Sequence, residues 1–344
     1  MDIEFKYFED SKISIEQYSD FLVKCYGEQA KHKLDDRLPW LKKRNNYRIL
    51  LAIENRKIIG QACCYDVIAV VEGKEIQLTW GIDNFVLPEA RGKGVGKILQ
   101  KILHESMPNF SSAWYSPTNG HIKKSCGAKS FISTKFPYYA ISKFLGIYLE
   151  ILLRLVLKRT IQIKPLKPNL YYRLLYNGKL NHYTLTEING FTKEHIDFIN
   201  DSLANKFDFY IKRDEKYLKW KYDENPSIKG FHIIEVKKEN RIVAVISFTK
   251  PRIRSFLLAT YWGVTILDLF VKDEKMFKNK DALKIVVEFY KNRGIMLDGI
   301  STFFDVPYSV KICYPSKGIP FLSTYEGNIK KAYISFLDQD IEQI

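Results

Sequence analysis

The sequence predicts an α+β protein of two domains, each a mixed, mostly antiparallel sheet flanked by helices, joined by an apolar linker helix. A chain of 344 residues exceeds the usual size of one hydrophobic core, and 46% hydrophobic residues can fill two. Strand-like segments precede an amphipathic helix in the first half, and the same order recurs in the second. We therefore expect domains at residues 1–140 and 173–344, with the linker helix and an extended connector at 141–172.

Three successive strands are predicted in "NYRILLAIENRKIIGQACCYDVIAVVEGKEIQLTWGIDNFVL", broken by turn signals at Asn55-Arg56 and Glu72-Gly73-Lys74. Short connections of this kind predict an antiparallel meander. An apolar stripe at helical spacing from Val95 to His104 then predicts an amphipathic helix. A strand at 112–116 and a short helix, beginning near Thr118 and ending at Gly127, complete the first domain.

The linker is apolar on nearly every side. Residues 142–159, "SKFLGIYLEILLRLVLKR", carry a narrow polar stripe, and their longest apolar run is too short for a membrane span. A helix buried between the domains is the favoured interpretation. The alternative is a helix on a membrane surface, which would give the protein a peripheral membrane contact.

The second half looks like a copy of the first. "LPWLKKRNN", "ENRKIIG" and "TWGIDNFVLPE" recur in order as "YLKWKYDENP", "ENRIVAV" and "YWGVTILDLFVKDE". The pairs Trp80-Gly81 and Trp262-Gly263 lie 182 residues apart. We therefore predict an internal duplication, with Trp80, Trp220 and Trp262 in the cores.

Net charge and cysteine content limit which ligands, metals and compartments are expected. A net charge of +15 suits an anionic partner or a solvated basic surface, but no nucleic-acid motif is present, so no nucleic-acid partner is expected. Five cysteines without a CxxC spacing, and no His, Cys or carboxylate cluster, predict neither a disulfide framework nor a metal site. The first residues, "MDIEFKYFED", resemble no secretory signal, which favours the cytoplasm.

One stretch concentrates glycine and positive charge. "ARGKGVGK" holds three glycines and three basic residues at positions 91–97, between a predicted strand and a predicted helix. A strand that runs through glycines into a helix directs unpaired N–H groups and the positive end of the helix dipole at one spot, which suits a pyrophosphate. The second half reads "KMFKNKD" there, so only the first half can bind such an anion.

Two common phosphate loops do not fit this stretch. A Walker A loop requires glycine at Arg91 and Ser or Thr at Ile98. A dinucleotide fingerprint requires glycine at Lys97 or Leu99 and a parallel βαβ unit. The pattern that does match is Arg-x-x-Gly-x-Gly, formed by Arg91, Gly94 and Gly96 after "VLPE".

This pattern resembles the acetyl-CoA loop of the GNAT superfamily of N-acetyltransferases. The resemblance covers roughly residues 1–140 and ends with "CGAKSF", and it reaches the second half only through the internal repeat, as a degenerate GNAT-like domain. It implies acetyl-CoA as co-substrate, no metal, and an acceptor amine on a small molecule or amino sugar. The implied cofactor-binding residues are Val86, Leu87, Arg91, Gly92, Lys93, Gly94, Val95, Gly96 and Asn119.

The resemblance also implies direct attack of the amine on the acetyl carbonyl, without a protein nucleophile. Asp83 is then the candidate base, with a water-relayed proton transfer as the alternative. Many family members protonate the departing thiolate with a tyrosine four residues before the closing glycine, where this chain has Lys123. That departure leaves Tyr115 and Ser125 as the candidate acids.

Two other functions stay open at this point. The first is a non-catalytic acyl-CoA-binding module held at a membrane surface by residues 142–159. The second is a Fem-like aminoacyl transferase, which also pairs two GNAT-like domains but typically lacks an intact CoA loop. An acetyl-CoA-dependent N-acetyltransferase is the leading hypothesis.

Overall fold

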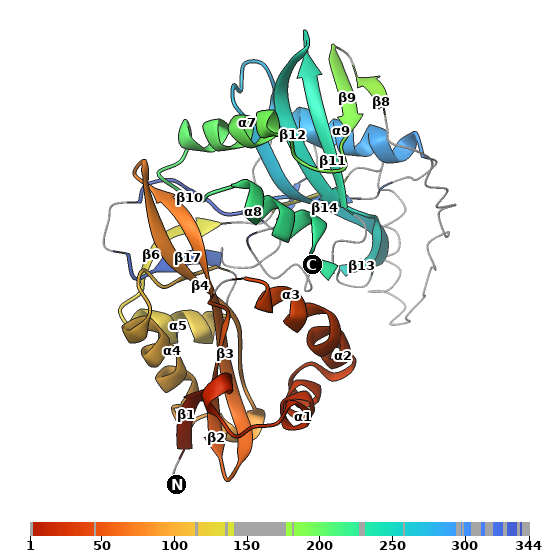
Figure 1. Cartoon of the computed structure of the whole chain (residues 1–344). Coiled ribbons are helices and arrows are strands. Elements are labelled where there is room, and N and C mark those ends of the chain that lie inside the picture. The colour runs from red at the N-terminus through yellow and green to blue at the C-terminus, as the bar shows by residue number, and fades with distance from the viewer. Residues whose placement is uncertain are drawn as a thin grey trace.

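Two nine-stranded sheets organise the described part of the chain in this computed structural model (Figure 1). The structure describes residues 3–44, 46–113, 116–134, 137–140, 177–180, 182–226, 231–256, 259–293, 297, 299–303, 311–313, 319–325, 329–335 and 338. The predicted linker helix at 142–159, its connector and Tyr115 lie outside these residues.

The first sheet is built on the predicted meander. Its strand order is β1-β2-β3-β4-β5-β17-β6, and β2, β3 and β4 pair antiparallel in sequence. Both connecting turns have two residues with positive φ, Asn55 and Arg56 at 51° and 60° and Glu72 and Gly73 at 50° and 78°, as tight hairpin turns require. The strands are β1 (Ile3–Tyr7), β2 (Arg48–Glu54), β3 (Lys57–Val71), β4 (Lys74–Val86), β5 (Ser111–Ser112), β17 (Ile319–Ser323) and β6 (Lys129–Thr134).

Helices cover both faces of the meander (Figure 1). On one side lie α1 (Ile15–Tyr26), α2 (Ala30–His32), the π-helical turn η3 (Lys33–Arg37) and α3 (Leu38–Lys42); on the other lie α4 (Val95–Ser106) and α5 (Pro117–Ser125). Ser14 and Gln17 form a capping box that starts α1. The cap of α5 is Ser116 rather than the predicted Thr118, because Pro117 suits the first helical position.

The second sheet repeats the connectivity of the first. Strands β9, β11, β12 and β14 pair antiparallel in that order, and β14 then pairs parallel with β15 as β4 does with β5. The duplication itself stays a prediction. The elements are β8 (Asn177–Leu180), β9 (Tyr183–Glu187), α7 (Lys193–Ala204), α8 (Glu215–Leu218), η5 (Lys219–Asp223), β11 (Phe231–Lys238), β12 (Arg241–Thr249), β13 (Arg252–Phe256), β14 (Ala259–Val271), α9 (Asn279–Lys291), β15 (Gly299–Ser301) and β16 (Lys311–Cys313).

The two sheets exchange strands across the predicted domain boundaries. β17 lies between β5 and β6 in the first sheet, and β7 (Pro137–Ala140) lies between β15 and β16 in the second. β10 (Phe209–Ile211) also pairs with β3, and β18 (Ala332–Tyr333) pairs with β10. Each sheet is therefore completed by residues from the other half of the chain.

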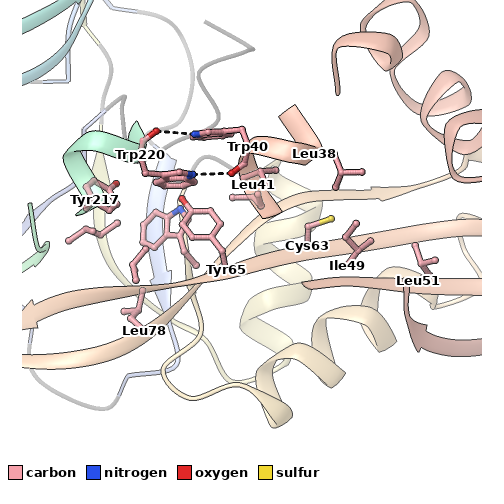
Figure 2. Packing of buried hydrophobic residues seen from close by; sticks show 14 of the residues in the cluster. Leu38, Trp40, Leu41, Ile49, Leu51, Cys63, Tyr65, Leu78, Tyr217 and Trp220 are labelled. Atoms are coloured by element: carbon pink, nitrogen blue, oxygen red, sulfur yellow. Dashed lines mark hydrogen bonds between the residues drawn. The ribbon is translucent and has the colours of Figure 1, made fainter. Parts of the chain in front are cut away.

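A pair of tryptophans links the halves (Figure 2). Trp40 on α3 and Trp220 in η5 stack with ring centroids 4.4 Å apart and planes 9° apart. Each indole N–H donates to the other's backbone carbonyl, Trp40 at 2.9 Å and Trp220 at 3.2 Å. These residues come from the repeated segments "LPWLKK" and "YLKWKY", and Trp220 and Trp80 are buried as predicted.

Candidate functional site

Strands β4 and β5 separate after one paired position. Trp80 is opposite Ser111, β5 ends at Ser112, and β4 continues to Val86. Gly81 follows the last contact because the Phe110 ring approaches so closely that a Cβ there would lie 2.4 Å from it. Residues 81–86 therefore border an opening in the sheet, which we call the β4–β5 opening.

The backbone of Val86 faces this opening. Val86 is opposite Gly60, and the neighbouring Leu87 N–H donates to Ile59 O at 2.9 Å. In an antiparallel ladder this alternation turns the N–H and C=O of Val86 away from β3. The Leu87 N–H is already occupied, so the structure argues against its predicted contact with a cofactor.

A β-bulge lies on β4 beside the opening. The register changes between Gln61, opposite Phe85, and Cys63, opposite Ile82. Asp83 occupies the bulge with a φ of 45°, a left-handed conformation that is costly for a residue with a side chain. Such irregularities re-aim side chains and often lie next to active sites.

The glycine stretch forms a turn before α4, with two of its glycines in the left-handed region. Gly92 and Gly94 have φ of 81° and 78°, and Gly94 precedes the first residue of α4 without a side-chain cap. Among the described residues, no hydrogen bond with good distance and angle is formed by the N–H groups of residues 92–96. The free amides and the N-terminus of α4 therefore form the kind of site that was predicted for an anion.

The basic residues of the loop are exposed around these amides. Arg91 Nε donates to Val86 O at 3.1 Å, and Lys93 lies 3.6 Å from Glu54. Lys97 is exposed on the first turn of α4. The structure brings Arg91, the glycines and Val86 together at one end of the β4–β5 opening.

Helix α5 closes this end of the opening. A Cβ built on Gly96 would lie 3.5 Å from Val86 Cγ2 and 3.7 Å from Ile122 Cδ1, so loop, strand and α5 converge there. Asn119 lies half-buried in the first turn of α5, where its N–H donates to the Ser116 hydroxyl at 3.2 Å. Val86, Gly96 and α5 thus meet at one place, and the cofactor contacts of the predicted residues stay predictions.

Asp83, the predicted base, lies in a buried ion-pair cluster. Its carboxylate is 3.1 Å from Lys33 Nζ and 3.3 Å from Arg37, and the Tyr26 hydroxyl lies 3.5 Å away. Burial disfavours the charged carboxylate, but Arg37 and Lys33 outweigh it and lower the pKa of Asp83. A carboxylate held this way accepts a proton poorly, which argues against the predicted role.

Lys123 is buried on the inner face of α5. Its side chain is 1% exposed, its ammonium donates to the Ser112 hydroxyl, and Nζ lies 5.8 Å from the centroid of the Phe110 ring. Burial lowers the pKa of Lys123 to about 7. Sequence reasoning noted this lysine only as a departure from a family pattern, although a lysine on the apolar side of a helix was itself a signal.

The candidate acids are placed differently. Ser125 is exposed at the end of α5, and its hydroxyl donates to Ile122 O at 2.7 Å, so the structure argues against it as an acid. Tyr115 lies outside the described residues, and its role stays a prediction. Sequence reasoning missed Lys33, Arg37 and Ser112, because their positions depend on contacts between distant segments.

A metal cluster and a membrane-spanning helix are both absent from the described ranges. Within them, no group of three or more His, Cys, Asp or Glu side chains could hold a metal ion. No helix of that part of the chain has the length and hydropathy that crossing a bilayer requires.

Solved structures with the same fold are N-acyltransferases of several kinds. A probable N-acyltransferase from Enterococcus faecalis V583 has a TM-score of 0.54 at 10% identity, over 94% of this chain and 72% of that one. A GCN5-related N-acetyltransferase from Anabaena variabilis has a TM-score of 0.53 at 15% identity, over 93% and 72%. Saccharomyces cerevisiae N-myristoyltransferase, solved with myristoyl-CoA and inhibitors, has a TM-score of 0.50 at 12% identity, over 93% and 79%.

These TM-scores show a shared fold, and a sequence comparison assigns a domain within the first half. No curated protein sequence matched the chain. The sequence model of the Acetyltransferase (GNAT) family matches residues 15–111, which run from α1 through the bulge and the glycine loop to β5. Residues 15–111 therefore match a GNAT acetyltransferase domain, which lies in the first half of the chain.

Proposed function

We propose that the protein is an acetyl-CoA-dependent N-acetyltransferase that transfers the acetyl group directly to an amine of a small molecule or amino sugar. The observation that carries the proposal is the set of amides at residues 92–96, which form no hydrogen bond with good distance and angle among the described residues. Backbone N–H groups at a helix start, with Arg91 and Lys97 nearby, suit the pyrophosphate of CoA. The bound co-substrate would supply an activated thioester.

The β4–β5 opening supports the same function. The outward N–H of Val86 is available to a polar group of the extended arm of the co-substrate. Direct transfer then requires positioning, polarisation of the carbonyl and removal of one proton from the amine. Because Asp83 is held as a paired carboxylate, we propose that this proton leaves through water rather than through Asp83.

The first experiment measures CoA binding by isothermal titration calorimetry. Gly94→Asp and Arg91→Glu should weaken binding roughly 100-fold or more, equivalent to about 2.7 kcal/mol, because each puts a negative charge beside the diphosphate site. Gly73→Asp is the matched control, since Gly73 also has a φ of 78° and open space around it but lies in the β3–β4 turn. CoA affinity unchanged by Gly94→Asp would defeat the proposal.

The second experiment identifies the acyl group and the acceptor. The fold is shared with enzymes named for different acyl groups, so acetyl-CoA and myristoyl-CoA should be compared as donors against one panel of amines. We expect acetyl transfer to an amino sugar or another small amine. Tight CoA binding without transfer to any amine would favour the non-catalytic acyl-CoA-binding module instead.

A further inference from the structure

Lys123 occupies a different environment from the other buried lysines of the described chain. Lys33 pairs with Asp83 at 3.1 Å, and Lys221 lies 4.8 Å from the centroid of the Trp220 ring. Lys123 lies against a serine hydroxyl and a phenylalanine ring, and it is the most completely buried of the three. Burying an ammonium costs free energy and favours its neutral form.

The ammonium of Lys123 lies where β4 and β5 part. Ser112, which accepts its hydrogen bond, is the last residue of β5 and follows Ser111, the partner of Trp80. The Phe110 ring near Nζ is the ring that packs against Gly81, the first residue of β4 beyond that pairing. Nζ therefore lies at the end of the β4–β5 opening where the two strands part. It is on the face of the sheet that α4 and α5 cover, and the glycine loop is on the same face.

The other polar groups around Lys123 come from three elements. His104 on α4 is close enough to interact electrostatically, but burial lowers the pKa of His104 to about 4, so it is neutral at pH 7. On β5 the Ser111 hydroxyl donates to Ser323 of β17 at 2.7 Å. His121 and Lys124 on α5 itself are exposed.

We propose that Lys123 donates a proton to the sulfur of the departing thiolate, an inference that rests on the acyl transfer proposed above. As the amine nitrogen bonds to the carbonyl carbon, the carbon–sulfur bond breaks with its electron pair on sulfur, and the Lys123 proton completes a neutral thiol. The amine proton leaves to water, and the neutral Lys123 amine regains a proton from water, so charge and atoms balance. A free thiol has a pKa of about 8.5, so transfer from an ammonium of pKa about 7 runs downhill.

The first test observes the lysine without turnover. The protein is labelled with ¹³C at lysine Cε, and the signal lost in Lys123→Met but kept in the control Lys124→Met is titrated by NMR. It should titrate near pH 7. CoA should move its midpoint, and the CoA analogue that lacks the thiol should not, because only the sulfur would lie beside Nζ.

The second test uses single-turnover acetyl transfer. Lys123→Met should slow transfer about 100-fold, the lower range for losing a general acid, and should remove the fall in rate above pH 7. Lys124→Met should keep the rate and pH profile of the wild type. Equal midpoint shifts with CoA and its thiol-free analogue, or an unchanged rate and profile in Lys123→Met, would overturn the proposal. Failure of wild-type protein to bind CoA would instead defeat the proposed function.

Discussion

Burial disfavours the charged forms of both Asp83 and Lys123, but only at Lys123 does it determine the direction of the pKa shift. At Asp83, burial opposes the charge, but two cations within hydrogen-bonding reach overcome it and lower the pKa of the carboxyl. At Lys123, burial prevails and brings the pKa of the ammonium to about 7. A carboxylate that stays charged serves as a fixed support, whereas an ammonium that titrates near neutrality can exchange its proton.

Asp83→Asn should therefore destabilise the protein. The change leaves Lys33 and Arg37 buried beside a neutral group, and breaking a buried pair of this kind costs about 3 kcal/mol. Urea denaturation at pH 7 measures the loss. The exposed Asp20→Asn on α1 is the control and should change the free energy of unfolding little.

The free energy of unfolding at low pH tests the same variant in a second way. Because the folded pKa of Asp83 lies below the value of about 3.9 for an unfolded aspartate, its stabilisation is fully present above that value. It is lost as pH falls through the folded pKa. The stability difference between wild type and Asp83→Asn should therefore shrink below about pH 4, and a constant difference would contradict the ion-pair interpretation.

At the level of single helices and strands, local signals predicted the structure well. The strand-like runs between Arg48 and Val86 and the two turn signals predicted the meander, because strand propensity and turn chemistry are properties of neighbouring residues. The glycine loop was predicted for the same reason. The cap of α5 was placed two residues late, because Pro117 was not weighed as a first helical residue.

Contacts between distant segments were the part that local signals could not predict. The burial of Lys123 depends on Ser112 and Phe110, and the charge of Asp83 depends on a π-helical turn about 50 residues earlier. Neither partner set has a sequence spacing that marks it. Sequence reasoning therefore located the glycine loop, whose anion-binding role stays a prediction, but not the buried contacts of Asp83 and Lys123.

The Trp40–Trp220 pair should be strongly coupled energetically. Trp40→Phe and Trp220→Phe each keep an aromatic ring but remove one indole N–H donor. A double-mutant cycle by urea denaturation should give a coupling energy of about 1 kcal/mol or more. Additive effects would mean that the two rings stabilise their own halves independently.

Across the whole molecule, the strand exchange makes each half depend on the other. The first sheet contains β17 between β5 and β6, and the second contains β7 between β15 and β16. Without its exchanged strand, each sheet would expose two unpaired edges. The boundaries predicted near residues 140 and 173 thus divide the sequence by its repeat, while the sheets combine strands from both sides.

A fragment of residues 1–140 should therefore fail to fold. It lacks β17 and β10, so we expect little cooperative unfolding and slight protection from amide hydrogen exchange. The control is full-length protein cleaved after folding at a protease site inserted between residues 141 and 176, whose two pieces should stay together in gel filtration. A well-folded fragment with native CoA affinity would contradict this dependence.

The exchanged strand also determines when the first sheet can be completed during biosynthesis. The glycine loop leaves the ribosome early, but β5 beside it is paired only when Leu322 and Ser323 have been made, about 210 residues later. At typical synthesis rates of about 5–20 residues per second, that delay is roughly 10 to 40 seconds. The nascent first half must wait through this interval with an incomplete sheet, so a chaperone that shields strand edges would raise the yield of active protein more than one that acts on the finished chain.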